Sequence, residues 1–213
     1  RLALAVRRLL ETKALVVYSD SPRAQLHLEQ LGWAGKLHSG HGDYVFTVNS
    51  NVGWSKVDRN IVRHVNYLVD ITDPQYPRSQ LQLTYKNLSG SAATGCEPQW
   101  ATMTSGLGLY EDLKEACYWN YLRVYVPEGI TLLGFTSLPL PPGSVAQGLS
   151  VAKEGEETLM VGSEYGKTVL SGLFSLGAGE TKHIQFEYNL PGHVITTGEN
   201  LLTYALFLQK QPG

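Results

Sequence analysis

The sequence predicts a mainly β protein, and three observations lead to that expectation. In Cys117–Pro127 (CYWNYLRVYVP), apolar Leu122, Val124 and Val126 alternate with Tyr121, Arg123 and Tyr125, the period-two pattern of a strand with one buried face. Further short apolar segments follow it, separated by turn-forming Gly and Pro. The composition has 22 Gly, 10 Pro and 12 Tyr but only 17% charged residues. Together these features favour an immunoglobulin-like antiparallel β-sandwich, preceded by a small α/β lobe.

The first part of the chain has a different pattern. Leu2–Glu11 has the spacing of a short amphipathic helix, and Ala14–Tyr18 (ALVVY) is a continuous apolar run that predicts a buried strand. Ser21 and Pro22 then supply an N-cap and a first-turn proline for a second helix that ends near Gly32. We therefore expect residues 1–75 to form a small α/β lobe, the tail of an upstream domain, and residues 76–213 to form the β-sandwich domain.

Strands are expected from Asp43 onward. Tyr44–Val48 is one, and Ile61–Ile71 fits either period but alternates more cleanly as a strand. A turn at Asp73-Pro74 leads into a return strand through Leu81, Leu83 and Tyr85. Six further strands are predicted after the central one: Ile130–Thr136, Leu149–Ala152, Thr158–Gly162, Lys167–Leu176, Lys182–Tyr188 and Leu201–Lys210. Both faces of the last strand are largely apolar, which predicts a position inside a sheet.

The two cysteines, Cys96 and Cys117, belong to no CxxC pair and have no neighbouring His, so metal binding and redox catalysis are poor interpretations. A disulfide between them would join the long loop at 89–108 to the start of the central strand and contribute about 3 kcal/mol. The alternative is a pair of buried, unpaired thiols. The disulfide is the preferred interpretation, and it predicts an extracytoplasmic location, at the cell surface or secreted.

The bulk properties exclude several classes of partner. The net charge is −2 and no Lys/Arg run is longer than two residues, so the sequence offers no electrostatic basis for nucleic-acid binding. No apolar run approaches the ~20 residues that span a bilayer, and a membrane anchor is expected only upstream of Arg1. No P-loop, GxGxxG or GxSxG motif is present, so we predict no cofactor and no catalytic residue.

Two groups of side chains could carry chemistry in principle. His38, His41 and Asp43 lie close together in sequence, but a Gly-rich segment without a third His favours solvated histidines over a metal site. An acid/base pair could be drawn from Asp20, Asp58, Asp70 and Asp73. Each of these lies beside a turn, where capping is the usual duty of Asp.

One loop has the composition of a ligand site. Asn49, Asn51, Trp54 and Lys56 lie within NSNVGWSK, and the Trp54 ring could stack on a sugar. The alternative is a turn in which the Asn side chains satisfy backbone groups, and this is the favoured interpretation.

Four blocks of the sequence, HLEQLGWAGKL, DYVFTVNSNVGWSKVDRNI, CYWNYLRVYVPEG and QKQPG, carry a resemblance to a known family. They resemble the C-terminal half of the bacterial proteins known as domain of unknown function 4012. The resemblance implies an envelope protein with an N-terminal membrane anchor, in a family some of whose members are associated with exopolysaccharide genes. It implies no activity and no catalytic residue. Trp54 stands where the resemblance would place a small residue.

Two classes of function follow from these observations. The first is a non-enzymatic structural or interaction module of the bacterial cell surface, whose partner is itself, by self-assembly, or another envelope protein. The second is a module that binds or processes an envelope polysaccharide. The absence of a recognisable carboxylate pair argues against processing.

Overall fold

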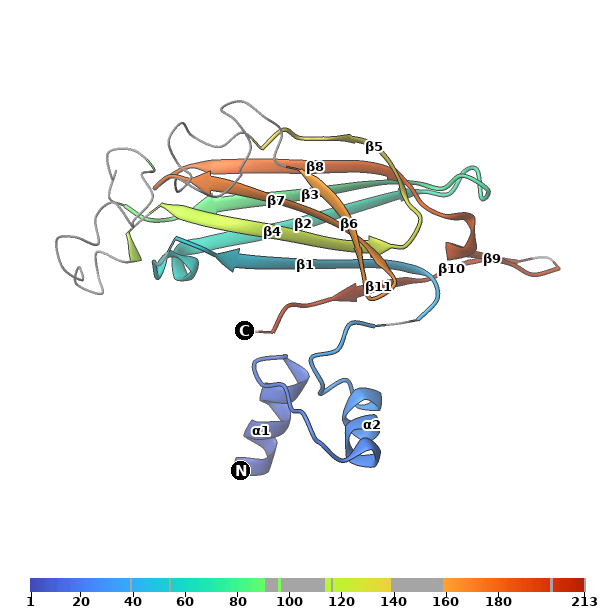
Figure 1. The fold of residues 1–213 in the computed structure, drawn as a ribbon, viewed down its shortest axis with the longest axis horizontal. Helices are drawn as coiled ribbons and strands as arrows, with labels where there is room; N and C mark the ends of the chain where they lie inside the picture. The colour runs from blue at the N-terminus through green and yellow to red at the C-terminus, as the bar shows by residue number, and fades with distance from the viewer. Residues whose placement is uncertain are drawn as a thin grey trace.

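In the computed structural model of the protein, two helices precede a body made of β-strands (Figure 1). The structure describes residues 1–38, 40–53, 55–90, 96, 114–115, 117–138, 159–199 and 201–212. The fold is mainly β with antiparallel sheets, as the sequence predicts. Within the described residues, no helix is long and apolar enough to cross a membrane. The predicted strand Leu149–Ala152 lies outside them.

The strands form two large sheets and one hairpin. The five-stranded sheet has the order β11 (Leu206–Gln209), β1 (Asp43–Asn51), β4 (Tyr118–Pro127), β7 (Lys167–Leu176), β6 (Met160–Glu164). The four-stranded sheet has the order β2 (Ile61–Asp70), β3 (Arg78–Asn87), β8 (Thr181–Asn189), β5 (Thr131–Phe135). β9 (Ile195–Thr197) pairs with β10 (Leu202–Tyr204). Every pairing is antiparallel except that of β1 with β11.

The two large sheets share one hydrophobic core. From β4, Leu122, Val124 and Val126 are at most 1% exposed, so the alternation read in this strand is confirmed. Alternate residues of β3 and β8 pack into the same core from the other sheet, among them Leu83 and Phe186. β3 and β8 bury alternate residues, which accounts for their period-two sequences. β4 and β7 also bury residues of their other face, among them Tyr125 and Val169.

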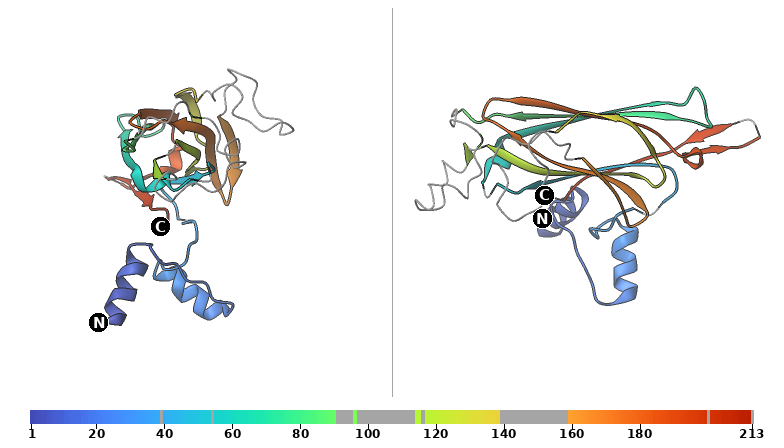
Figure 2. Two further views of the ribbon diagram at one scale, coloured as in Figure 1. Left: turned by 90° about the vertical axis from the view of Figure 1, so that its left-hand side faces the viewer. Right: turned by 45° about the horizontal axis from the view of Figure 1, so that its top comes forward.

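The N-terminal segment holds α1 (Leu2–Glu11) and α2 (Pro22–Gln30), and both helices were predicted. The strand predicted at Ala14–Tyr18 is wrong, because this stretch is an irregular connection between the two helices. Its Val17 N–H donates a backbone hydrogen bond to the Trp33 carbonyl. No strand of the described residues pairs with this apolar run. The lobe is therefore helical, and Figure 2 shows it standing apart from the strands.

The sheets begin earlier in the chain than residue 76, where the sandwich domain is expected to start. β1 lies beside β4, and β2 pairs with β3 along its whole length, from Ile61 opposite Asn87 to Asp70 opposite Arg78. Residues 43–70 thus belong to the same two sheets as the residues that follow them.

The C-terminal stretch differs from its prediction. Leu201–Lys210 is not one interior strand but two short ones, β10 and β11, separated at Ala205. β11 lies at the edge of its sheet, parallel to β1, and its Leu206, Phe207 and Leu208 are 41–62% exposed. The break is stabilised by a backbone hydrogen bond from Asp43 N–H to Ala205 O of 2.8 Å.

Candidate functional site

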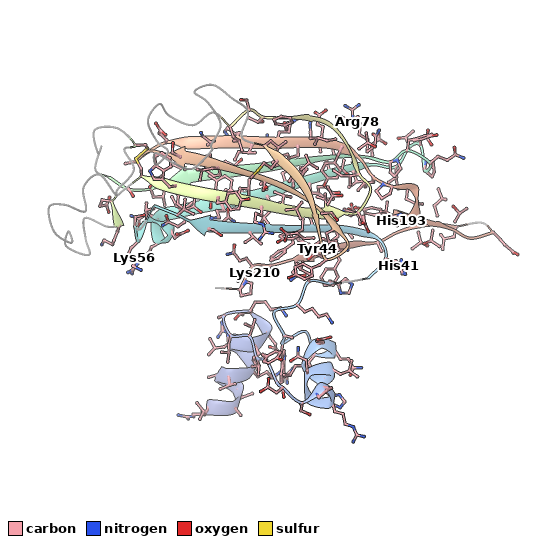
Figure 3. The ribbon with its side chains drawn as sticks, viewed as in Figure 1. His41, Tyr44, Lys56, Arg78, His193 and Lys210 are labelled. Carbon is pink, nitrogen blue, oxygen red and sulfur yellow. A yellow bond between two sulfur atoms is a disulfide. The ribbon has the colours of Figure 1, made fainter. Side chains whose placement is uncertain are left out.

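The predicted ligand loop uses its asparagines within the protein. The Asn49 Oδ1 atom accepts hydrogen bonds from the Tyr85 hydroxyl at 2.8 Å and from Asn120 Nδ2 at 2.9 Å. Asn51 donates to the Ser55 carbonyl and accepts from the Gly53 amide, which closes the turn. Lys56 is exposed at one end of the strand body (Figure 3), and Trp54 lies outside the described residues.

Asn49 belongs to a chain of polar groups that crosses the core between the sheets. Tyr118 donates to Asn120 Oδ1 at 2.9 Å, and Arg63 donates to the Tyr118 hydroxyl at 2.9 Å. Burial raises the pKa of Tyr118 to about 12. Each buried polar atom in this chain has a partner, so the chain joins the two sheets.

The three side chains considered for a metal site point to different places. His38 stacks on Phe207 with ring centroids 3.8 Å apart, and Asp43 is buried among tyrosines. His41 instead lines a pocket beside His193. Among the described residues, no group of three or more His, Cys, Asp or Glu is placed to hold a metal ion.

Asp43 is the centre of a second buried network. It is 1% exposed, and its Oδ2 accepts hydrogen bonds from the hydroxyls of Tyr67 (2.6 Å) and Tyr204 (2.5 Å). Its Oδ1 accepts from the Tyr44 amide, and the Tyr67 hydroxyl, whose one proton goes to Asp43, accepts a hydrogen bond from the Ser79 hydroxyl. Burial raises the pKa of Asp43, and these hydrogen bonds oppose that rise. Sequence reasoning could not find these partners, because Tyr67 and Tyr204 lie 24 and 161 positions away.

Three of the other predicted aspartates, Asp58, Asp70 and Asp73, make short-range contacts. Asp70 accepts from the amide and hydroxyl of Thr72, which lower its pKa, and Asp73 accepts from the Gln75 amide. Asp58 forms an ion pair with Arg63. These contacts give no acid/base pair.

The predicted disulfide is confirmed. Cys96 and Cys117 are bonded, with their Cα atoms 5.4 Å apart. Such a bond is consistent with an extracellular location.

Several exposed apolar side chains lie on the helices and on β11. In α1 only Leu10 is buried, and α2 buries no residue. We define the helix–edge surface as the exposed apolar side chains of α1 and β11: Leu2, Leu4, Val6, Leu9, Leu206, Phe207 and Leu208. A groove of about 520 Å³ separates the helical segment from β11, and the Lys210 ammonium spans it to reach the Thr12 carbonyl.

Comparison with known proteins finds no match to any family model, any curated protein or any solved structure.

Proposed function

We propose that this protein is a non-enzymatic, extracytoplasmic interaction module of the bacterial cell surface that associates with a second copy of itself through the helix–edge surface. One observation carries the proposal. α1 is amphipathic, with Arg7 and Arg8 opposite Leu2, Val6 and Leu9, yet its apolar stripe is exposed. A stripe of this kind is normally buried against another element. Its exposure therefore indicates a partner surface.

The location and architecture in this proposal have separate support. The Cys96–Cys117 disulfide supports an extracytoplasmic site. Two facing sheets with a common core support an immunoglobulin-like sandwich. The resemblance to domain of unknown function 4012 supports membership of that envelope family, and it agrees with a surface role.

The edge strand next to the helices adds to the argument for self-association. β11 and β6 are the two end strands of the five-stranded sheet. Unpaired strand edges template pairing with another chain unless they are blunted by charge or proline. Within β11 the exposed residues are Leu206, Phe207 and Leu208, and the nearest charge and proline, Lys210 and Pro212, come only after its end. A second copy could cover this edge and the apolar stripe together.

Light scattering coupled to size-exclusion chromatography tests the proposal. The wild-type chain is expected to show a mass that rises with concentration, and the double substitution Leu2→Glu with Leu9→Glu to give a monomer. As matched controls, Leu68→Glu on β2 and Val161→Glu on β6 replace equally exposed apolar residues elsewhere and should behave as wild type. A wild-type monomer across the whole concentration range would rule out self-association.

The second class of function, polysaccharide binding, was predicted from the loop at Asn49–Lys56. The amide groups of both asparagines are already bonded within the protein. This loop therefore adds no support to that class, and the interaction module is the function that we propose.

A further inference from the structure

A pocket of about 460 Å³ at the β6–β7 turn contains Lys167, which forms no ion pair with any other described residue. Its walls include His41, Glu128, Tyr165, Lys167 and His193, and Figure 3 shows both histidines at this end of the strand body. Lys167 is only 6% exposed. We propose that this pocket binds the carboxylate group of a small polar ligand, with Lys167 as the charge partner.

Lys167 is held in place but left without an anion. Its ammonium lies over the Tyr44 ring, 4.5 Å from the centroid, and within the described part of the chain it makes no ion pair or hydrogen bond. Burial lowers its pKa, and Glu128 opposes this from beyond ion-pair distance. Charged side chains this deeply buried are normally paired. A bound anion would supply the missing partner at a position that is already fixed.

A strained tyrosine at the rim is an independent sign of a ligand. Tyr165 and Gly166 form the two-residue turn between β6 and β7, with φ values of +50° and +68°. Such turns favour Asn or Gly at both positions, and a bulky residue at positive φ is uncommon. The Tyr165 side chain is nevertheless 84% exposed, so packing does not explain its presence. A ring kept at a strained turn beside a pocket indicates contact with a ligand.

The charges of the pocket favour a carboxylate over a phosphate. Lys167 provides one positive charge, and Glu128 places a negative charge in the same pocket. Glu128 repels any anion, but it repels a dianion about twice as strongly as a monoanion at the same distance, so a carboxylate is the better fit to a single lysine. The imidazoles of His41 and His193 and the Glu128 carboxylate can then hydrogen-bond to hydroxyl or amide groups of the ligand.

Calorimetric titration of the full chain with three probes tests this inference: glucuronate, N-acetylglycine and glucose. We expect one or both carboxylates to bind saturably with dissociation constants in about the millimolar range, and glucose not to bind. Binding of glucuronate alone would identify a sugar acid as the ligand class, and binding of N-acetylglycine alone a peptide carboxylate. The proposal is overturned if neither carboxylate binds, or if glucose binds as tightly as glucuronate.

Substitutions locate the binding. Lys167→Met keeps the stem over Tyr44 and should weaken carboxylate binding about 10-fold or more, whereas Lys167→Arg should restore most of it. The matched control is Lys182→Met, which removes another partly buried lysine over an aromatic ring, 5.6 Å from the Phe174 centroid. Unchanged affinity in Lys167→Met, or equal loss in both Met variants, would show that Lys167 is not the charge partner.

Tyr165→Asn separates ligand contact from structure. Asn tolerates the left-handed turn better, so this variant should unfold at a higher urea concentration while binding the carboxylate more weakly. The exposed Tyr76, changed to Asn in the same way, should leave binding unaltered. If Tyr165→Asn binds the carboxylate with the affinity of the wild type, the Tyr165 ring does not contact the ligand.

Discussion

Asp43 offers a sharp test of the buried polar network, because its carboxylate is surrounded by hydroxyl and amide donors and not by a cation. Asp43→Ala removes the acceptor of the Tyr204 hydroxyl and the Tyr44 amide, while Tyr67 keeps its bond to Ser79. Each buried group left without a partner costs about 1–3 kcal/mol. The two groups that lose their acceptor would together lower the free energy of unfolding by about 2–6 kcal/mol, and the relief of no longer burying a charge offsets part of this loss.

Asp43→Asn keeps the shape of the side chain but removes its charge, so it measures the effect of the charge on stability. Burial raises the pKa of Asp43 in the folded protein above that of the unfolded chain, so the folded state favours the protonated form. The contribution of this group to stability is therefore fully present below about pH 3.9 and is lost as the pH rises through the folded pKa. The stability of the wild type relative to Asp43→Asn should decrease from low pH toward neutrality.

Urea unfolding followed by tryptophan fluorescence at several pH values measures both effects. Comparing the two proteins at each pH cancels the other carboxylates, such as Glu187, whose pKa is lowered by hydrogen bonds from Gln80 and Arg78. A difference between wild type and Asp43→Asn that stays constant or grows with pH would refute the assignment of a raised pKa. An Asp43→Ala variant as stable as wild type would refute the role of the network.

Three further predictions concern single features of the fold. Replacing both Cys96 and Cys117 by Ala should lower the free energy of unfolding by about 3 kcal/mol, since the bond closes a loop of 21 residues; an unchanged urea midpoint would contradict this. Gly42→Ala should cost about 1–3 kcal/mol in a thermal melt, because φ is +108° and a Cβ would lie 2.8 Å from the Ala205 carbonyl oxygen; an equal melting temperature would count against it. Tyr118 has a folded pKa of about 12, above its unfolded value of about 10, so its contribution is full below pH 10 and is lost as the pH rises through 12; ultraviolet titration should show this hydroxyl resisting ionisation until the protein unfolds.

The Lys167 pocket shows which signals a single sequence hides. The Tyr-Gly pair before Lys167 forms a hairpin turn in which Asn-Gly would be usual. This unusual choice of residue can be recognised from the sequence alone. The sequence does not reveal that Lys167 has no anionic partner at ion-pair distance among the described residues. This environment depends on Tyr44 and His193, which come from distant parts of the chain.

Local periodicity was enough to determine the strands with one buried face. β8 matches its predicted range closely, since alternation of apolar and polar residues reports which face is buried. β4 and β7 also match their predicted ranges, although both of their faces are largely buried. The two helices and the disulfide followed from short-range signals as well: a Ser-Pro start, a Gly end and only two cysteines.

For some segments, the sequence pattern is compatible with several structures, and only tertiary contacts determined which element each segment forms and what it pairs with. Ala14–Tyr18 is as apolar as a buried strand, but no strand of the described residues pairs with it. Leu201–Lys210 is divided between two sheets because Tyr204 bonds to Asp43 while β11 pairs with β1. Asn49 likewise became part of the core network through Tyr85 and Asn120. A sequence encodes which face of a segment is apolar, whereas the element that covers that face is set by contacts between residues far apart in the chain.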